Sequence, residues 1–506
     1  MVSAADYLRK VLLSPVYEAA RVTPLQTLKK LSERLGNHVS LKREDLQPVH
    51  SFKLRGAYNK MVQLTAAQKK RGVICASAGN HAQGVALSAR RLGCRAVIVM
   101  PVTTPRLKID AVAALGGEVV LHGDSYTDAY GHALALQAEQ GLTFVHPFDD
   151  PDVIAGQGTI AMEILRERHG DEISCIVVPV GGGGLIAGIA SYTKALYPHI
   201  RIIGVESEDA PTLHDALAAG RPTRLPRVGV FADGTAVREI GHETFRIARD
   251  FVDEVVLVST DEICAAIQDI FEDTRVVAEP SGALAVAGLK RWLQTHDGGE
   301  RACVAVVSGA NMGFDRLRHV AERADLGAER EMLLAVTIPE QPGSFKRFCE
   351  VIGTRSVTEF NYRYGGPGAA HIFVGLAIDP GSDDRNHVVH AIRAAGLAVE
   401  DLSRNEMAKL HVRYMVGGKA AGITDERLFR FEFPERRGAL LKFLDAIGTD
   451  WNISLFHYRN HGSDHGRVLA GIQVPSNTAD AFAQHLADLG YAHVEESDNP
   501  GYRAFL

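Results

Sequence analysis

The stretch Ser51-Phe52-Lys53-Leu54-Arg55-Gly56-Ala57 places a lysine among small and apolar residues, directly after a polar loop. A lysine in surroundings of low dielectric loses its proton more easily and can then form a Schiff base with an aldehyde. The alternative is a lysine whose stem crosses an apolar surface while its ammonium group reaches water. The stretch alone does not decide between them, and three later segments favour the reactive lysine.

Each of these three segments begins where an apolar run with strand character ends. They are Ser77-Ala78-Gly79-Asn80 after the run 72–76, Gly181-Gly182-Gly183-Gly184-Leu185 after the run 175–180, and Ser308 after the run 302–307. Glycines and free N–H groups at the start of a helix bind phosphate or carboxylate groups. Sheets of α/β proteins bind ligands at the carboxyl ends of their strands. Together with Lys53, the segments predict a site for a phosphorylated aldehyde cofactor.

In composition and order, these segments resemble the fold-type II pyridoxal-phosphate enzymes, and Ser51–Ala57 resembles the lysine motif of serine/threonine dehydratases. The resemblance spans about the first 320 residues and implies an α/β fold with two parallel-sheet subdomains. It implies that Lys53 holds pyridoxal 5′-phosphate and then acts as the catalytic base that removes the Cα proton. The further cofactor contacts that it implies are Phe52, Asn80, Gly181, Gly182, Gly183, Gly184, Leu185 and Ser308. For the substrate carboxylate it implies Ser77, Ala78 and Gly79.

The residue type at position 308 indicates the reaction. A neutral Ser308 facing the pyridine nitrogen would leave the ring less electron-withdrawing than a carboxylate would, which favours β-elimination. For L-threonine the products are 2-oxobutanoate and ammonia. The donor of a proton to the leaving hydroxyl stays open between the cofactor phosphate and Glu163, and His81 is interpreted as structural.

A dinucleotide site is the alternative interpretation of the glycine run. Gly181, Gly183 and Glu206 roughly imitate the nicotinamide fingerprint. However, Ile186 stands at the third fingerprint position, where close helix–strand packing needs a glycine or alanine. A dehydrogenase is therefore not favoured.

Composition sets wider limits. A chain of 506 residues exceeds one hydrophobic core, so two or three domains are expected. The net charge of −6 argues against nucleic-acid and anionic-membrane partners. No apolar stretch reaches membrane-spanning length and the N-terminus lacks a signal-peptide core, which predicts a cytoplasmic protein. The six cysteines form no C-x-x-C pair and are interpreted as reduced core thiols, and no metal site is predicted.

The last third of the chain contains an internal repeat. Pro339-Glu340, Gly343, Ile352-Gly353-Thr354 and Phe360-Asn361-Tyr362-Arg363 recur in the same order as Pro434-Glu435, Gly438, Ile447-Gly448-Thr449 and Phe456-His457-Tyr458-Arg459. Each copy is typical of a split βαβ pattern of two helices and four strands. The pair resembles the ACT-like, ferredoxin-type α+β regulatory domains of biosynthetic threonine dehydratases. Catabolic dehydratases and serine racemases resemble the first part alone.

These observations predict five segments along the chain. They are a catalytic domain at 1–320, a connector helix at 321–331, one ACT-like domain at 332–404, a linker at 405–425 and a second ACT-like domain at 426–506. Within the repeat, His457, His461 and His465 have a spacing that would suggest a metal on a helix. Asn460, Gly462, Ser463 and Asp464, which lie between these histidines, indicate the tip of a hairpin between two strands instead.

Resemblance also implies a regulatory site in the repeat, where isoleucine inhibits and valine opposes it. The effector residues expected are Arg355, Tyr362, Glu435, Leu440 and Tyr458, although a structural role is the alternative for both tyrosines. The overall prediction is a homotetrameric L-threonine dehydratase, acting on L-threonine or also L-serine, at the first committed step of isoleucine synthesis. The alternatives are a catabolic dehydratase or racemase with an unusual tail, and a non-catalytic amino-acid sensor. The presence of Lys53, Asn80 and Ser308 weighs against the sensor.

Overall fold

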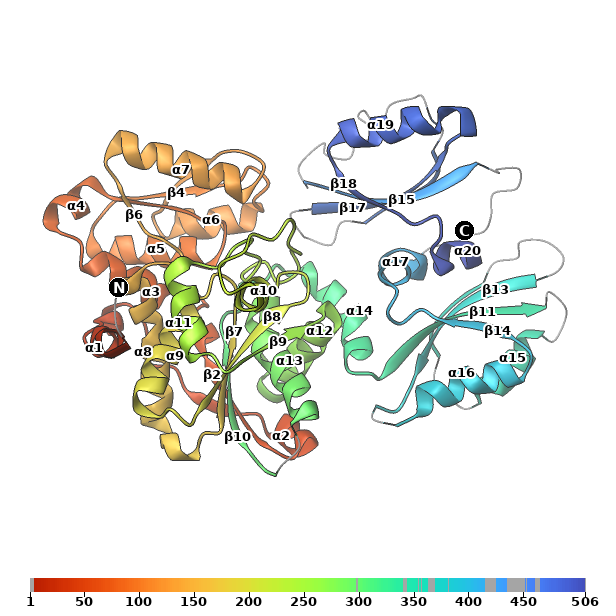
Figure 1. Cartoon of the computed structure of the whole chain (residues 1–506), viewed down its shortest axis with the longest axis horizontal. Helices are drawn as coiled ribbons and strands as arrows, with labels where there is room; N and C mark the ends of the chain where they lie inside the picture. Colours follow the sequence, from red (N-terminus) through yellow and green to blue (C-terminus); the bar gives the residue numbers. More distant parts are fainter. Residues whose placement is uncertain are drawn as a thin grey trace. The chain divides into compact units, whose positions relative to one another are not determined.

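The chain forms two compact units, Met1–Ala324 and Asp325–Leu506, in a computed structural model. The structure describes residues 4–296, 299–339, 344–353, 355, 357–362, 369–380, 382–414, 425–434, 451, 453–459 and 465–505. Figure 1 shows both units and labels most of their helices and strands. Each unit is considered by itself below.

A six-stranded sheet forms the larger part of the first unit. Its order is β1 (Leu25–Thr27), β2 (His38–Arg43), β10 (Ala302–Val307), β7 (Cys175–Pro179), β8 (Arg201–Ser207) and β9 (Glu254–Val258). All neighbours are parallel except β1, which pairs with β2 antiparallel at the edge. Parallel sheets are covered on both faces, so their strands are apolar throughout. Strand β7 and residues 303–307 of β10 are accordingly buried.

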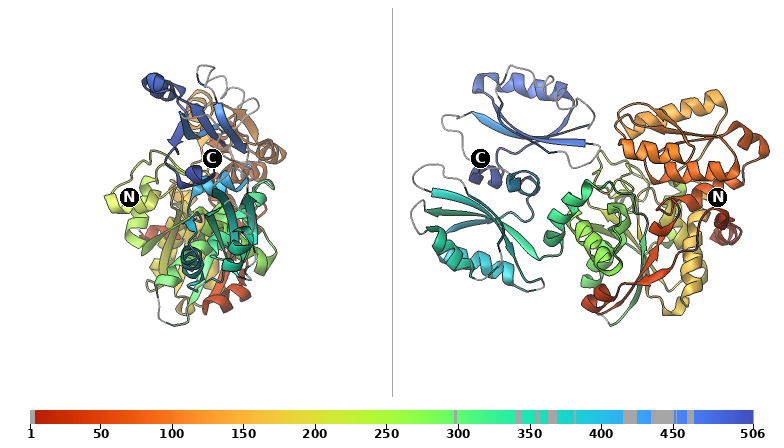
Figure 2. Two further views of the ribbon diagram at one scale, coloured as in Figure 1. Left: turned by 90° about the vertical axis from the view of Figure 1, so that its right-hand side faces the viewer. Right: turned by 180° about the vertical axis from the view of Figure 1, so that it is seen from behind.

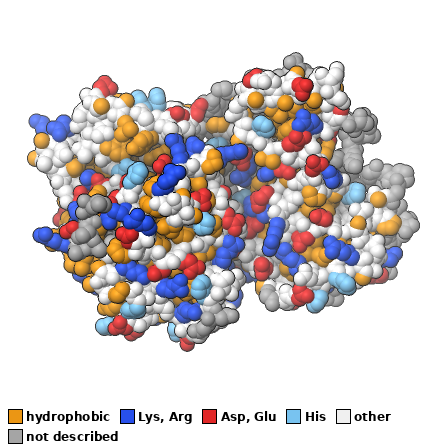
Figure 3. Space-filling view, viewed as in Figure 1, with side chains coloured by type: hydrophobic (Ala, Val, Ile, Leu, Met, Phe, Trp, Pro, Cys, Tyr) orange, Lys and Arg blue, Asp and Glu red, His pale blue; other side chains and the backbone are white. Residues whose placement is uncertain are grey.

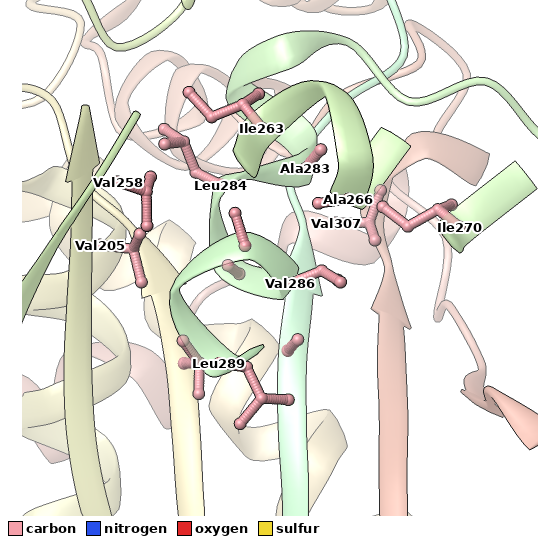
Figure 4. Packing of buried hydrophobic residues seen from close by; sticks show 14 of the residues in the cluster. Val205, Val258, Ile263, Ala266, Ile270, Ala283, Leu284, Val286, Leu289 and Val307 are labelled. Carbon is pink, nitrogen blue, oxygen red and sulfur yellow. The ribbon is translucent and has the colours of Figure 1, made fainter. Parts of the chain in front are cut away.

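Helices cover both faces of this sheet. One face carries α2 (Lys29–Leu35), α12 (Thr260–Thr274) and α13 (Pro280–Thr295), and the other carries α8 (Pro151–Glu167), α9 (Gly184–Leu196) and α11 (His242–Phe251). Figure 4 shows Leu284 and Leu289 of α13 close to Val205 of β8. Each buried leucine of this kind stabilises the fold by about 1.5–3 kcal/mol relative to an exposed one.

A smaller parallel sheet forms the second part of the same unit. Its order is β5 (Glu118–Leu121), β4 (Ala96–Met100), β3 (Val73–Ala76) and β6 (Thr143–Phe144). Helices α3 (Lys53–Val62), α5 (Asn80–Leu92) and α6 (Arg106–Ala114) share one hydrophobic cluster with this sheet, and α7 (Tyr126–Gln140) packs in another. The two parallel-sheet subdomains confirm the predicted fold class of the first part.

The second unit contains two antiparallel sheets with the same strand order. In the first copy the order is β12 (Val357–Tyr362), β13 (Ala369–Ala377), β11 (Glu331–Pro339) and β14 (Ala398–Asp401). In the second it is β16 (Ile453–Arg459), β17 (His465–Gln473), β15 (Glu426–Pro434) and β18 (Ala492–Glu495). Figure 2 shows helices on one face of each sheet, with α15 (Ser344–Ile352) and α16 (Asp384–Ala394) in the first copy and α19 (Ala479–Leu489) in the second. The ferredoxin-type α+β prediction is confirmed for the repeat.

The two copies share one hydrophobic cluster within the second unit. Leu333 of β11 and Phe373 of β13 belong to it, as do Leu428 of β15 and Leu469 of β17. Two short helices, α17 (Glu406–Leu410) and α20 (Pro500–Phe505), contribute further apolar side chains, and Figure 1 shows them between the two sheets. Residues 406–410 therefore form structure inside the segment that the sequence predicted as a linker.

The sequence predicted a connector helix at 321–331, and the observed helix α14 (Arg316–Gly327) begins before this segment and ends within it. Glu329 has a φ of 56°, in the left-handed region that helices do not continue through, and β11 begins at Glu331. The division between the units falls at Ala324/Asp325, inside α14.

Acidic and basic side chains are interspersed on the face drawn in Figure 3. Among the described residues, none of the helices combines the length and the apolar character that a membrane crossing requires.

Candidate active site

Lys53 is the first residue of α3, next to Phe52, whose ring centroid lies 5.2 Å from the lysine Nζ atom. The Nζ atom donates a hydrogen bond of 2.9 Å to the carbonyl of Pro147. Burial lowers the pKa of Lys53 to about 8, although the nearby carboxylate of Glu279 acts in the opposite direction. A larger fraction of this amine is therefore neutral near pH 7 than of an exposed lysine.

The glycine run Gly181–Gly184 links β7 to α9, and the carbonyls of Gly181 and Gly182 each accept a hydrogen bond from a threonine hydroxyl. Thr212 Oγ1 donates to the carbonyl of Gly181 at 3.0 Å, and Thr244 Oγ1 donates to that of Gly182 at 2.7 Å. In a trans peptide the N–H of the next residue points opposite to the carbonyl. The N–H groups of Gly182 and Gly183 therefore point away from these threonines and, with the start of α9, form a site for a phosphate.

Glycine is required at two of these positions for different reasons. A Cβ atom at Gly182 would lie 2.2 Å from the ring of Phe148, so any other residue there would require this ring to move. Gly183 has a φ of 88°, in the region that favours glycine, and directly precedes α9. Leu185 follows in the first turn of α9 and is buried.

Asn80 is the first residue of α5, at the carboxyl end of β3. Its Nδ2 atom donates to Glu279 Oε1 at 2.7 Å, and its Oδ1 atom accepts from Asn311 Nδ2 at 2.7 Å. Burial raises the pKa of Glu279 to about 7, and the charge of Asp233 adds to this effect. Glu279, which the sequence analysis did not identify, thus contacts the predicted cofactor residue Asn80.

Ser77, Ala78 and Gly79 form the half-buried loop between β3 and α5. The N–H of Ser77 donates to the carbonyl of Val99 at 3.1 Å, which continues the β3–β4 pairing by one residue. The N–H of Gly79 donates to Ser77 Oγ at 3.3 Å. The loop therefore lies directly before Asn80, where its groups can reach the same ligand.

Ser308 follows β10, is buried, and is joined to the segment that carries Lys53. Its carbonyl accepts from the N–H of Phe52 at 3.1 Å, and Ser51 forms a β-bridge with Gly309. Its hydroxyl donates to the carbonyl of Ser281 at 3.3 Å, a long bond that rotation of the hydroxyl can break. The structure thus brings Ser308 next to the residue before Lys53.

The structure excludes Glu163 as the proton donor to the leaving hydroxyl. Its carboxylate accepts from Lys42 Nζ at 2.6 Å and from Arg55 Nη1 at 2.6 Å, and all three side chains are almost fully buried. Burial alone would raise the pKa of Glu163, but Arg55 and Lys42 hold it below its ordinary value. A residue that stays ionised between two cations has no proton to give.

Two further side chains have structural partners. Glu206 accepts hydrogen bonds from Thr212 Oγ1 and from two backbone N–H groups at the start of α10 (Thr212–Ala219), so it caps this helix. The ring of His81 hydrogen-bonds to the carbonyl of Val145 at 2.8 Å. Burial lowers the pKa of His81 to about 3, which keeps the ring neutral.

Sequence reasoning missed Glu279, Asn311 and Phe148. A signal existed for two of them, because Glu279 directly precedes the proline that opens α13 and Asn311 belongs to the segment that begins at Ser308. Nothing local indicated that Phe148 would fill the space beside Gly182.

In the second unit, Arg355 pairs with Asp384 and donates to the carbonyl of Ile352 at 2.9 Å. Tyr362 lies in β12 and Tyr458 in β16, with His457 beside it. The predicted effector residues Glu435 and Leu440, the turn glycines Gly343 and Gly438, and His461 lie outside the described residues. Within the described ranges, no group of three or more His, Cys, Asp or Glu side chains is placed to hold a metal ion.

Residues 16–309 match the family of pyridoxal-phosphate dependent enzymes, and the chain belongs to this family. Two further matches, over residues 322–412 and 417–506, are to the C-terminal regulatory domain of threonine dehydratase. They confirm the internal repeat and the resemblance to the biosynthetic threonine dehydratases, and they do not favour a catabolic dehydratase or a racemase.

Relatives match along the whole chain. It is 58% identical over 504 residues to the biosynthetic L-threonine dehydratase of Burkholderia multivorans, which covers 99% of each chain. It is 55% identical over 503 residues to that of Escherichia coli, covering 99% of this chain and 97% of the relative. Mitochondrial threonine dehydratase of Saccharomyces cerevisiae is 52% identical over 514 residues, covering 99% and 89%.

Solved structures agree with this assignment. The processed form of threonine deaminase isoform 2 from Solanum lycopersicum has a TM-score of 0.62 and 49% identity, covering 63% of this chain and 93% of that chain. Maize serine racemase has a TM-score of 0.59 and 32% identity, covering 63% and 97%.

The described residues fit pyridoxal phosphate. The glycine run has no room for a Cβ at Gly182 and directs N–H groups away from its supporting threonines, as a phosphate site requires. Lys53 has the lowered pKa that an amine needs to react with an aldehyde at neutral pH.

Proposed function

We propose that this chain dehydrates L-threonine to 2-oxobutanoate and ammonia, and that Lys53 is its catalytic lysine. The observation that carries the proposal is the set of contacts that joins Lys53, Asn80 and Ser308 through Phe52, Glu279 and Gly309. Full-length similarity to biosynthetic threonine dehydratases supports the substrate.

Bound pyridoxal phosphate would supply an electron sink for the Cα carbon of an amino acid. Lys53 would hold it, with Phe52 beside the linkage, and the N–H groups of Gly181–Leu185 would bind its phosphate. Asn80 would donate a hydrogen bond to its ring hydroxyl, and Ser308 would face its pyridine nitrogen. Ser77, Ala78 and Gly79 would bind the substrate carboxylate.

The residues of this chain then assist two events: the removal of the Cα proton and the loss of the β-hydroxyl group. The neutral amine of Lys53 removes the Cα proton as a general base, which its lowered pKa favours. The electrons of the broken Cα–H bond form a double bond between Cα and Cβ, and the β-hydroxyl leaves with the electrons of the Cβ–O bond and takes up a proton to become water. The resulting enamine then takes up one water and yields 2-oxobutanoate and ammonia. L-Serine differs by one methyl group, and binding discriminates weakly against a missing methyl, so slower turnover of L-serine is expected.

The regulatory unit would bind isoleucine as an inhibitor and valine as its antagonist, at sites that include Arg355, Tyr362, Glu435, Leu440 and Tyr458. Two similar but unequal copies allow two ligands to bias one equilibrium in opposite directions. Leu440→Phe should relieve isoleucine inhibition with little change in the uninhibited rate. Calorimetric titration with isoleucine tests this, and unchanged binding in Leu440→Phe, Tyr362→Ala and Tyr458→Ala would place the effector elsewhere.

We also propose a homotetramer in the cytoplasm, at the first committed step of isoleucine synthesis, on the strength of the same family resemblance. Sedimentation velocity of the full chain tests the tetramer.

The activity itself is tested by 2-oxobutanoate formation from L-threonine. Lys53→Ala should abolish it, whereas Lys60→Ala, at the other end of the same helix, should retain most of it. Turnover by Lys53→Ala close to that of the parent would contradict the proposal.

A further inference from the structure

Two side-chain amides form a continuous hydrogen-bonded chain beside Lys53. Asn311 Nδ2 donates to the carbonyl of Val49 at 2.8 Å and to Asn80 Oδ1 at 2.7 Å. Asn80 Nδ2 then donates to Glu279 Oε1 at 2.7 Å. The chain therefore begins at one acceptor, a backbone carbonyl, and ends at another, a carboxyl oxygen.

These two ends determine the orientation of both amides. A backbone carbonyl cannot donate, so the NH2 group of Asn311 must face Val49. A flipped Asn80 would place its NH2 group against the NH2 group of Asn311 and its oxygen against the Glu279 carboxylate. The contact between the two NH2 groups would be repulsive whatever the charge of Glu279, and the contact between the two oxygens would be repulsive when Glu279 is ionised. The observed orientation satisfies all three partners in either state.

This orientation leaves a defined hydrogen-bonding capacity at Asn80. Its NH2 group has two hydrogens, and one of them is used by Glu279. Its oxygen already accepts from Asn311. The remaining N–H is a donor with a fixed direction, suited to an oxygen atom that carries negative charge.

Gly309 is part of the same arrangement. Its carbonyl accepts from the N–H of Glu279 at 3.1 Å, which fixes the backbone from which the carboxylate extends. A Cβ atom at Gly309 would lie 2.6 Å from Glu279 Oε1 and 3.2 Å from Asn80 Nδ2. A side chain there would push apart the two atoms whose contact orients the amide.

We propose that Asn311 and Glu279 are positioning residues that hold the Asn80 amide in one orientation and so reserve one N–H for the ring hydroxyl oxygen of pyridoxal phosphate. This inference rests on the proposed function, because it assigns that cofactor to the same site. Neither residue needs to touch the substrate for this role.

Asn311→Asp tests the proposal because it keeps the size of the side chain and removes its donor. The carboxylate would repel Asn80 Oδ1 and favour the flipped amide, which presents no N–H to the ring hydroxyl. Asn37→Asp is the matched control, since Asn37 Nδ2 also donates to a backbone carbonyl, that of Leu35, at 2.7 Å.

The measurement is the dissociation constant of the full-length apoprotein, by equilibrium dialysis, for pyridoxal 5′-phosphate and for 3-deoxypyridoxal 5′-phosphate. A charge-assisted hydrogen bond to the ring hydroxyl corresponds to a preference of about tenfold for the first ligand. The parent and Asn37→Asp should show this preference, and Asn311→Asp should lose it. The comparison of two ligands removes the effect of the new charge on the phosphate and aldehyde groups that both ligands share, and the uncharged Glu279→Leu variant checks the loss of preference without an added negative charge.

Glu279 provides the second pair of variants, in case Asn311→Asp does not fold. Glu279→Leu should lose the preference, whereas Glu279→Gln retains an acceptor and should keep it. An unchanged preference in both Asn311→Asp and Glu279→Leu would overturn the inference. A parent that binds neither ligand would instead overturn the proposed function, so the two failures are distinguishable.

Discussion

Two buried acidic side chains lie within reach of the helix that begins at Lys53, and they differ in their charge environment. Glu163 contacts two cations, Lys42 and Arg55, and its pKa is lowered. Glu279 contacts a neutral amide, Asn80, and its pKa is raised to about 7. Burial is common to both, so the partners decide whether the acid is ionised. The first environment suits a structural anchor and the second suits a ligand site.

The structural anchor is a network of four buried charged side chains, one of which, Arg55, belongs to α3. Arg55 donates to Glu44 at 2.7 Å and to Glu163 at 2.6 Å, and Lys42 donates to Glu163 at 2.6 Å. Two acids and two bases are almost completely excluded from water, and their charges cancel. Such a network is costly to break because each remaining charge would be buried without a partner.

The largest effect is therefore expected from Arg55→Met. It should lower the free energy of unfolding of the first unit by about 3–5 kcal/mol, because two carboxylates would remain with one lysine. Urea unfolding followed by the fluorescence of Trp292 measures this in a Trp451→Phe background, since the chain has two tryptophans. As a control, Arg95→Met removes an exposed pair with Glu118 and should cost less than about 1 kcal/mol. Equal losses of unfolding free energy in Arg55→Met and Arg95→Met would show that the buried network stabilises the fold no more than an exposed ion pair does.

Glu279→Gln tests whether Glu279, the buried acid without a cationic partner, has a raised pKa. The raised pKa of Glu279 means that the native state binds its proton more tightly than the unfolded state does. Its contribution to stability is therefore complete below about pH 4.5 and is lost as the pH rises through about 7. The apoprotein should lose on the order of 3 kcal/mol across this window relative to Glu279→Gln, which cannot ionise. Parallel stability–pH curves for the two proteins would show that Glu279 is not perturbed.

Gly182→Ala should have a smaller effect, because the new Cβ atom meets a side chain and not backbone. Displacement of the Phe148 ring should cost about 1–3 kcal/mol in stability or in cofactor binding. Phe148→Leu in the same chain should recover part of the loss. Failure of the double variant to recover would mean that Phe148 does not limit this position.

The smallest effect concerns chemical reactivity without any loss of stability. Competitive acetylation of the apoprotein, followed by mass spectrometry, should give Lys53 a pH midpoint near 8. Lys60, on the same helix, has a raised pKa because Asp150 and Asp152 outweigh its burial. Its midpoint should lie above that of an ordinary lysine. Identical midpoints would remove the electrostatic basis for assigning Lys53.

How far the sequence predicts this molecule depends on the range of the interactions. Local patterns predict the end of a strand before Ser308 and the start of a helix after each of the loops at Ser77 and Gly181. In the structure β10 ends at Val307, α5 begins at Asn80 and α9 begins at Gly184. The contacts of Asn80 with Glu279 and with Asn311 join residues 199 and 231 positions apart, and no local pattern reveals them. Glu163 stayed open as a proton donor for the same reason, because its partners Lys42 and Arg55 are 121 and 108 positions away.

The repeat in the second unit was readable because both copies keep the same turn and strand residues. Even there, the side-chain pairing of Arg355 with Asp384 depends on how α16 packs, which the repeat does not specify. A single residue, Glu329 in the left-handed region, accounts for the early end of the expected connector helix.

The central claim is that Lys53 is the residue that holds the cofactor. It is tested most directly by adding pyridoxal 5′-phosphate to the full chain, reducing with borohydride, digesting, and locating the pyridoxyl group by mass spectrometry. We predict one modified peptide, with the group on Lys53. A pyridoxyl group on another lysine, such as Lys42 or Lys108, with Lys53 unmodified would contradict the account.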